Sequence, residues 1–566
     1  MQENLSALNI ITDQDVAVPM RDGVLLRANI FRPNTSTPLP VLLQRTPYKK
    51  ASAGYEPFVR AGYVVISQDT RGRYASDGEF KVFSEEDTGD PEDGYDTVEW
   101  AASQPWCDGN VGTFGKSYDG WMQYQLAKLQ PPHLKAMSAV AIPTELTDLD
   151  WPGAFKPARR IHWWLNDMAP DLRRRAGMLP PHTPSEAQTI WDELENGRML
   201  ALLPWSRVVE YLPEPLASQA ASWLREPARC PWKFREAHKR ITVPNLDFPG
   251  WYDHCSGIDH LGSMQEHATT QEARKQTRAI IGPWNHLYQG RRKQGIFDFG
   301  INAEMDLIQI QIRWFDYWLK DIRNGIDQEP VVQYFVMGSE QWKFADTWPP
   351  KNLDQVAFHL ASKGDAHVLD GSGTLQSEPL KNGATDTYAY DPYDPTPTLW
   401  DRTCVYNVSD RRHANHRPDI LRYDTKPLQE DLEVVGNPEV ILYAASSAPD
   451  TDFFDRLVDD NPDGPAMEVC YGLVRARHRN GFDTDELLTP GHITQFRIRL
   501  GATACCFRKG HRIRLEIYSS DFPNHDRNHN TGKNDLFDAE MVIAQQTIHH
   551  SPKHPSSLIL PTCAAS

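Results

Sequence analysis

The 566-residue sequence lacks the features that mark several large classes of protein. Its eight cysteines include no C-x-x-C pair, which argues against a disulfide framework and a zinc site. No apolar run approaches the ~20 residues that a membrane-spanning helix needs. The opening residues contain neither the basic segment nor the apolar core of a secretory signal. We therefore expect a cytoplasmic protein without a membrane span.

Basic residues are fewer than acidic residues. The chain has 59 Lys and Arg against 76 Asp and Glu, a formal net charge of −17. Such a surface repels phosphate backbones and anionic lipids, so we expect no nucleic-acid partner. The composition, 40% hydrophobic and 10% aromatic, is that of a globular protein. The length predicts about three domains, and homo-oligomerisation is left open.

Strand-like and helix-like segments alternate in the first part of the chain, which predicts a mostly parallel sheet covered by helices. The strands are expected at 41–45, 63–67 and 110–114, and the helices near 55–61, 95–102 and 118–129. The same pattern returns with strands at 245–249 and 279–282 and an amphipathic helix at 305–323. An α/β domain is therefore assigned to residues 1–145 and 243–325.

Two other regions have a different pattern. Residues 146–242 contain helix-like segments, proline clusters and many of the tryptophans, and we interpret them as a helical cap inserted into the α/β domain. Residues 326–566 contain many short alternating strands between turns, which predicts a jelly-roll β-sandwich. In the strand at 512–518, three apolar residues should face one side, and Arg512, Arg514 and Glu516 the other.

The strongest local motif is Gly115-Lys116-Ser117-Tyr118-Asp119-Gly120, between a predicted strand and a predicted helix. A nucleophile elbow needs this context, because the tight turn presents the serine hydroxyl beside free backbone N–H groups. The motif departs from G-x-S-x-G, since the second glycine comes one residue late. A glycine-rich turn with a capping serine is the alternative reading of these residues.

A serine nucleophile needs a base and a carboxylate, which α/β-hydrolases supply in the order Ser, Asp or Glu, His. Asp253 and His286 each follow a predicted strand, at the edge where open α/β sheets place reactive groups. Asp259 is the rival for the acid, and His254 and His260 lie nearby. We favour Asp253 because it falls at a strand end, whereas Asp259 begins the next predicted helix.

Several motifs together resemble the cocaine esterase family, which includes α-amino acid ester hydrolases and is related to X-Pro dipeptidyl peptidases. The matching segments are Arg45-Thr46-Pro47-Tyr48, Gln68 to Gly72 continuing to Gly78, Trp106 to Gly112 leading into Gly115-x-Ser117-Tyr118, Gly250 to Asp253, Gly282 to His286, and Ser520 to Asn528. The resemblance implies an α/β-hydrolase domain, a helical cap and a C-terminal jelly roll. It also implies a Ser117–His286–Asp253 triad.

The resemblance further implies that the Tyr48 hydroxyl and the Tyr118 backbone N–H form an oxyanion hole. Trp151 occupies the place of an aromatic pocket wall in the resembling esterases, and Trp163 and Trp164 are further pocket candidates, although aromatic residues at helical spacing are more often core. Leu399 and Trp400 follow a loop that, by resemblance, approaches the acyl site.

These patterns predict a serine hydrolase that cleaves small-molecule carboxylic esters. Amide cleavage, acyl transfer and a catalytically silent binding protein remain as alternatives. An α-amino preference is also open, with Glu145, Asp148 and Asp150 as candidate acids. No cofactor or metal is expected, since triad chemistry needs none and His525 and His529 lie in a loop.

Overall fold

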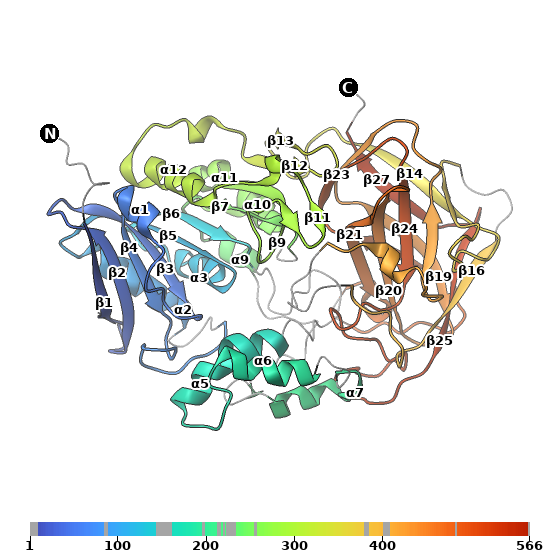
Figure 1. Cartoon of the computed structure of the whole chain (residues 1–566), viewed down its shortest axis with the longest axis horizontal. Helices are drawn as coiled ribbons and strands as arrows, with labels where there is room; N and C mark the ends of the chain where they lie inside the picture. The colour runs from blue at the N-terminus through green and yellow to red at the C-terminus, as the bar shows by residue number, and fades with distance from the viewer. Residues whose placement is uncertain are drawn as a thin grey trace.

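The computed structural model describes a chain with three parts (Figure 1). A helix-covered sheet forms one end of the molecule, a unit made almost entirely of strands forms the other, and helices of the middle segment lie along one side (Figure 1). The described residues are 9–83, 89–142, 161–194, 199–211, 217–218, 221, 234–253, 257–378, 384–399, 408–481 and 484–563. Within these ranges, every helix falls short of the length and apolar character needed to cross a membrane.

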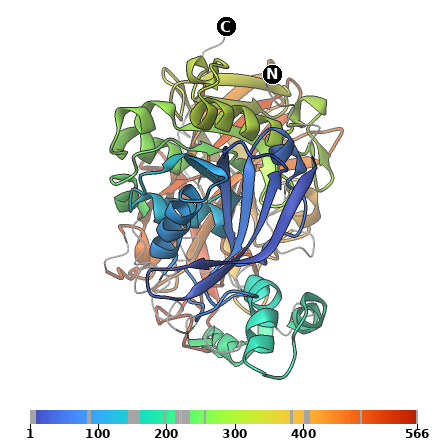
Figure 2. The ribbon, with the colours of Figure 1, turned by 90° about the vertical axis from the view of Figure 1, so that its left-hand side faces the viewer.

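The N-terminal sheet consists of four parallel strands with two antiparallel strands at one edge (Figure 2). In spatial order the strands are β1 (Ile10–Pro19), β2 (Leu25–Pro33), β4 (Val64–Asp69), β3 (Leu39–Thr46), β5 (Cys107–Lys116) and β6 (Leu134–Val140). Every residue of β4 is buried, as expected of a parallel strand with both faces covered.

The sheet continues beyond β6 with strands from later in the sequence. The backbone N–H of Met137 in β6 donates to the Pro244 carbonyl at 3.0 Å, which joins the two sets of strands. The second set is β7 (Leu246–Asp247), β9 (Arg278–Asn285), β12 (Val332–Val336) and β13 (Gln341–Ala345), and β8 (Gly250–Tyr252) pairs in parallel with β9. The open edge of the sheet beside β6 is thereby closed.

Helices cover both faces of this sheet. On one face, α2 (Asp90–Ala102) and α3 (Tyr118–Ala127) pack on the central strands, and on the other lie α1 (Glu56–Arg60) and α12 (Leu307–Lys320). Asp306 caps α12, accepting hydrogen bonds from the backbone N–H groups of Ile308 and Gln309. These elements confirm the helices predicted from the sequence.

The α/β sheet extends further along the chain than the sequence pattern indicated. Both β12 and β13 follow residue 325, where the sequence analysis places the start of the jelly roll, yet β12 pairs in parallel with β9. A short strand has the same alternating sequence pattern at the edge of an α/β sheet as in a β-sandwich. Periodicity therefore does not distinguish these two locations.

The middle segment is helical where it is described. It contains η2 (Trp164–Met168), which has π-helical hydrogen bonding, and then α5 (Ala169–Arg175), α6 (Pro184–Glu193), α7 (Met199–Ala201), η4 (Trp205–Tyr211) and α9 (Phe234–His238). Thr183 and Glu186 form a capping box at the start of α6. The chain then returns to the sheet, followed after β8 by α10 (Gly257–His267) and α11 (Gln271–Gln276).

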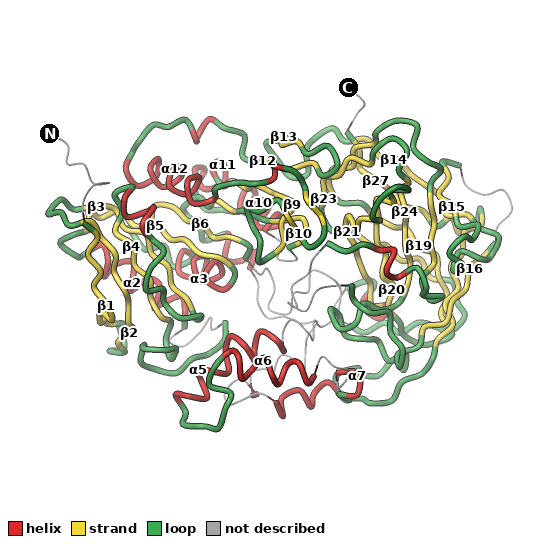
Figure 3. The backbone as a smooth tube through the Cα atoms, viewed as in Figure 1, coloured by secondary structure: helices red, strands yellow, loops and turns green. Residues whose placement is uncertain are grey.

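The C-terminal unit is made of strands joined by loops and turns (Figure 3). They are β14 (Asp354–Ala361), β15 (Thr374–Gln376), β16 (Thr385–Tyr390), β17 (Leu421–Asp424), β18 (Leu432–Gly436), β19 (Glu439–Ser446), β20 (Asp452–Asp460), β21 (Ala466–Arg475), β22 (Thr494–Arg499), β23 (Thr503–Phe507), β24 (Arg512–Tyr518), β25 (Ala544–Ser551), β26 (His554–Pro555) and β27 (Ser557–Thr562). The last strand, β27, lies inside the sheet between β14 and β19. An α/β-hydrolase domain with a helical cap and a C-terminal β-sandwich, the predicted fold class, is confirmed.

The polar face of β24 is buried, contrary to the half-exposed strand that its alternation suggests. Glu516 has no exposed surface and accepts a hydrogen bond from Arg411 at 2.8 Å, and Arg514 pairs with Asp424 and Asp460. Charged side chains that compensate one another inside the unit give the same sequence pattern as a solvated face.

Candidate active site

Ser117 stands at the turn between β5 and α3, in a backbone conformation with φ 62° and ψ −121°. A positive φ is strained for any residue other than glycine and marks the sharp turn of a nucleophile elbow. The glycines around it make the turn sterically feasible: a Cβ at Gly115 would lie 2.6 Å from the Cβ of Asp119, and one at Gly120 would lie 3.0 Å from the Val140 carbonyl oxygen. The late second glycine of the motif is thus explained by the close approach of α3 to β6.

Asp253 and His286 are brought together by two paired strands. Tyr252 at the end of β8 is the register partner of Asn285 at the end of β9, so the next residue of each strand emerges at the same place. The Nδ1 atom of His286 lies 3.1 Å and 3.2 Å from the two carboxylate oxygens of Asp253. The Asp253 side chain has no exposed surface, whereas the His286 side chain is 12% exposed. One imidazole nitrogen is therefore held by a buried carboxylate.

The loops that carry these two residues are fixed by further contacts. The Asn285 side-chain oxygen accepts hydrogen bonds from the backbone N–H groups of Leu287 and Tyr288, which shapes the turn at His286. The Nζ of Lys116, next to Ser117, donates to the His286 carbonyl oxygen at 2.9 Å. The elbow and the histidine loop are consequently in direct contact.

Tyr48 lies in the loop after β3, beside the elbow. Its phenol oxygen accepts a hydrogen bond from Nε1 of Trp163 at 3.1 Å, and it lies near enough to the Ser117 hydroxyl for that group to affect the pKa of Tyr48. Burial raises the pKa of Tyr48, and the nearby carboxylates of Asp167 and Asp119 raise it further, so the phenol keeps its proton. Tyr48 is therefore a neutral donor next to Ser117, and the sequence motif did not indicate its contact with Trp163.

The Tyr118 backbone N–H belongs to the first turn of α3, where helical N–H groups have no intrahelical acceptor. The Tyr118 side chain turns away from the loops into the core. Its hydroxyl donates to Asp90 at 3.0 Å and accepts from the Phe83 backbone N–H, and its ring stacks on Phe83. Only the backbone of Tyr118 is available to a group bound at Ser117.

Two carboxyl groups are buried beneath these loops, and no sequence pattern predicted their burial. Asp119 accepts a hydrogen bond from the Gln44 side chain at 2.8 Å, and Asp247 accepts from the backbone N–H groups of Ala141 and Phe248. Burial raises the pKa of each to about 7. Asp247 joins the ends of β6 and β7, so its role is to fix the strand ends from which the site is built.

Asp167 is a third carboxyl near the site. It lies one helical turn after Trp163, and its charge acts on Tyr48. The side chain is exposed, yet desolvation by surrounding protein raises its pKa to about 6.

The remaining candidates have varied positions. Trp164 is buried in the hydrophobic core that includes α3, and Leu399 packs against the core of the C-terminal unit. His260 is buried and 3.1 Å from His238. Trp151, Trp400, Glu145, Asp148, Asp150, His254 and the Asp259 side chain lie outside the described residues. Across the described part of the chain, no three His, Cys, Asp or Glu side chains form a group that would hold a metal ion.

The C-terminal unit supports the strand that carries Asp253. The hydroxyl of Tyr252, the preceding residue, donates to the Glu468 carbonyl oxygen of β21 at 2.9 Å. On the cap side, Arg527 donates to the Leu200 carbonyl oxygen, and the Ser206 backbone N–H donates to the Leu536 carbonyl at 2.8 Å. The C-terminal unit therefore contacts both the α/β domain and the cap.

The fold is that of the α/β-hydrolases, and the relatives of this chain identify it as a serine hydrolase of that class. Residues 22–288 match the model of the X-Pro dipeptidyl-peptidase S15 family, and residues 324–559 match the X-Pro dipeptidyl-peptidase C-terminal non-catalytic domain. The chain is 34% identical to cocaine esterase of Rhodococcus sp. (strain MB1 Bresler), over 98% of this chain and 99% of that protein. It belongs to the cocaine esterase-like family, and the predicted family is confirmed.

Solved structures show the same fold over the full length. An aminopeptidase from a marine sediment Thaumarchaeota archaeon superposes with a TM-score of 0.77 at 22% identity, covering 100% of this chain and 98% of its own. An α-amino acid ester hydrolase superposes with a TM-score of 0.75 at 23% identity, with the same coverage.

Proposed function

We propose that this chain hydrolyses carboxylic esters of a small molecule through a Ser117–His286–Asp253 triad. The observation that carries the proposal is the contact of His286 Nδ1 with the buried Asp253 carboxylate, beside an elbow that presents Ser117. The carboxylate fixes the proton on Nδ1, which leaves Nε2 as the basic nitrogen.

The proposed reaction proceeds in two halves. In the first, Ser117 Oγ attacks the ester carbonyl while His286 Nε2 takes the serine proton and then gives it to the departing alcohol, leaving an acyl-serine. In the second, water loses its proton to His286 and attacks the acyl carbon, and the free acid leaves as Ser117 regains the proton. The buried Asp253 carboxylate stabilises the imidazolium formed in each half.

Tyr48 and the Tyr118 backbone N–H would donate to the oxyanion of each tetrahedral intermediate. Two observations support this role: Tyr48 lies near Ser117 and keeps its proton, and the Trp163 N–H holds its oxygen in place. Removal of one oxyanion-hole donor costs about 10²–10³ in kcat.

Tyr48→Phe is therefore expected to lower kcat on p-nitrophenyl acetate by about 10²–10³, with the melting temperature unchanged within a few degrees. The ring is retained, so packing is preserved, and the hydroxyl is lost both as a donor and as the acceptor of the Trp163 N–H. Tyr55→Phe is a matched control, because that hydroxyl contacts Gln44 and Ser67 rather than Ser117. An unchanged kcat in Tyr48→Phe would remove Tyr48 from the mechanism.

Asp167 supports a preference for substrates that carry a positive charge. Asp167→Asn is expected to lower kcat/KM on a cationic ester about fivefold relative to its neutral isostere, the effect of losing one partly solvated ion pair. In the native protein the preference should grow as pH rises through about 6, because Asp167 becomes charged above its raised pKa. The test is the ratio of the two kcat/KM values against pH, with Asp192→Asn on α6 as control. A ratio that stays the same in Asp167→Asn would refute the assignment.

The direct test of the nucleophile is labelling with a fluorophosphonate followed by peptide mapping. We expect the label on Ser117. Adding an alcohol or amine as acceptor tests acyl transfer, which would be favoured if transfer product forms faster than free acid. No label together with no ester turnover would favour a binding protein.

A further inference from the structure

Lys116 is a charged residue of the elbow to which the proposed reaction gives no role. It is the last residue of β5, and its side chain is half-buried. Its Nζ donates to the backbone carbonyl oxygen of His286 at 2.9 Å, and Ser117 is the next residue of the chain. One side chain therefore connects the position of the proposed nucleophile with the residue proposed as its base.

Strand pairing alone does not place His286 beside Ser117. The pairing of β8 with β9 sets Asp253 next to His286, but β6 and β7 lie between β5 and β9. Three strand spacings amount to about 14 Å. The loop after β9 must therefore cross the carboxyl edge of the sheet to reach the elbow, and the Lys116 hydrogen bond fixes the place where it arrives.

This hydrogen bond also brings a positive charge close to the imidazole. The carbonyl oxygen and the ring belong to the same residue, so the Lys116 ammonium lies within the Debye length of about 10 Å from the ring. A cation at this range disfavours the protonated imidazole, whereas the Asp253 carboxylate favours it. Lys116 and Asp253 therefore act on His286 in opposite directions.

Two further acids lie around the elbow and the histidine loop. Asp119 is on α3 and Asp247 is on β7, and burial raises the pKa of each to about 7. The charge of Lys116 lowers the pKa of Asp119, and the charge of Asp253 raises that of Asp247. Several groups thus titrate in one pH range, so a change in pH dependence is assigned to His286 only by observing its ring directly.

We propose that Lys116 is a positioning residue for His286, holding the histidine loop against the Ser117 elbow and favouring, through its charge, the neutral ring that accepts the serine proton. The inference rests on the proposed Ser117–His286–Asp253 triad. Without the lysine, the loop loses its contact with the elbow and the protonated ring becomes more stable. Both changes slow the attack of the serine, because the base is displaced and a smaller fraction of it is free.

The test compares Lys116→Met, which removes the donor and the charge, with Lys116→Arg, which retains both. The kcat/KM on p-nitrophenyl acetate is measured against pH. In parallel, NMR of the full chain, with histidine labelled with carbon-13 at Cε1, follows the titration of the His286 ring, whose signal is identified by its absence from His286→Gln.

For Lys116→Met we expect a plateau kcat/KM about tenfold lower and a His286 titration midpoint about 0.5–1 pH unit higher. The base is neutral above its midpoint, so the rise of kcat/KM with pH should move to higher pH by the same amount. Lys116→Arg should recover most of both values, because its guanidinium is a charged donor.

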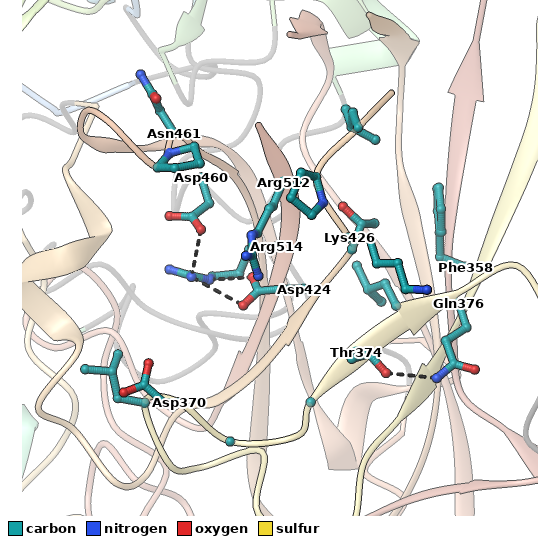
Figure 4. Close-up of a pocket in the computed structure, with 18 of the residues that line it drawn as sticks. Phe358, Asp370, Thr374, Gln376, Asp424, Lys426, Asp460, Asn461, Arg512 and Arg514 are labelled. Atoms are coloured by element: carbon teal, nitrogen blue, oxygen red, sulfur yellow. Dashed lines mark hydrogen bonds and ion pairs between the residues drawn. The ribbon is translucent and has the colours of Figure 1, made fainter. Parts of the chain in front are cut away.

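Two lysines provide matched controls. The Nζ of Lys135 also donates to a backbone carbonyl, that of Pro132 at 3.2 Å, but Lys135 lies near the start of β6, at the end away from the elbow. Lys426 is an exposed lysine lining an open cavity of the C-terminal unit to which no triad residue contributes (Figure 4). Lys135→Met and Lys426→Met should keep the native midpoint and plateau, which excludes an effect of net charge alone.

Each outcome decides the proposal, and melting temperatures establish that each variant is folded. An unchanged His286 midpoint in Lys116→Met would overturn it even if the rate falls, because a purely structural lysine gives that result. A shift that Lys116→Arg leaves in place would overturn it as well. The ring titration is observed without turnover, whereas the triad is tested by fluorophosphonate labelling. Failure of the proposed hydrolase and failure of this role for Lys116 are therefore observed separately.

Discussion

Replacement of Ser117 by alanine is expected to reduce ester turnover by about four to six orders of magnitude, because the acyl-enzyme then has no site to form on. The fold should survive, since the Ser117 side chain makes no capping hydrogen bond to α3. Ser117→Gly should be equally inactive yet more stable, by ~1 kcal/mol or more, because a φ of 62° is strained for serine and not for glycine. Thus the two variants separate the chemical role of the hydroxyl from the backbone strain.

The measurements are kcat on p-nitrophenyl acetate, fluorophosphonate labelling and thermal unfolding of the three proteins. Labelling of both variants at the same rate as the native chain would show that another residue is the nucleophile. A loss of stability in Ser117→Gly would show that the positive φ is not a source of strain.

The second large effect is expected for Asp253→Asn, which should lower kcat by about 10⁴. Asparagine fits the same space but presents an N–H to His286 Nδ1, so the imidazole adopts the wrong tautomer and loses the electrostatic support of the carboxylate. The Gln289 amide, which lies 3.5 Å from Asp253, has no charge with which to replace it.

Asp259→Asn provides the matched control, because Asp259 is the other acid considered from the sequence. We expect its kcat to remain within about threefold of the native value, because the proposal assigns the orienting role to Asp253 alone. The reverse result, a severe loss in Asp259→Asn and little change in Asp253→Asn, would reassign the orienting acid. Measuring kcat of both variants at several pH values would show whether either substitution changes the pH dependence of the reaction.

The parts of the fold that the sequence predicts well are those set by local pattern. The elbow at Ser117 was recognisable because its glycines and its strand-to-helix context are contiguous in the sequence. Asp253 and His286 could be placed together because both follow strands whose carboxyl ends meet at one edge of a sheet. Their catalytic roles stay predictions.

The features that were not predicted depend on burial by distant segments. The contact of Trp163 with Tyr48 joins residues 115 positions apart, and the same spacing of aromatics occurs in an ordinary core helix. The raised pKa of Asp119 comes from desolvation, which has no signature in the sequence. Glu516 alternates with apolar residues as an exposed side chain would, although Arg411 pairs with it inside the unit.

The place of β27 has a consequence for synthesis of the protein. As the chain leaves the ribosome, the N-terminal sheet emerges first, but β14 and β19 gain their shared neighbour only when residues 557–562 have been translated. Tyr252, beside Asp253, is anchored to β21 of the same late-completed unit. A nascent chain therefore carries Ser117 long before the unit that anchors Tyr252 is complete.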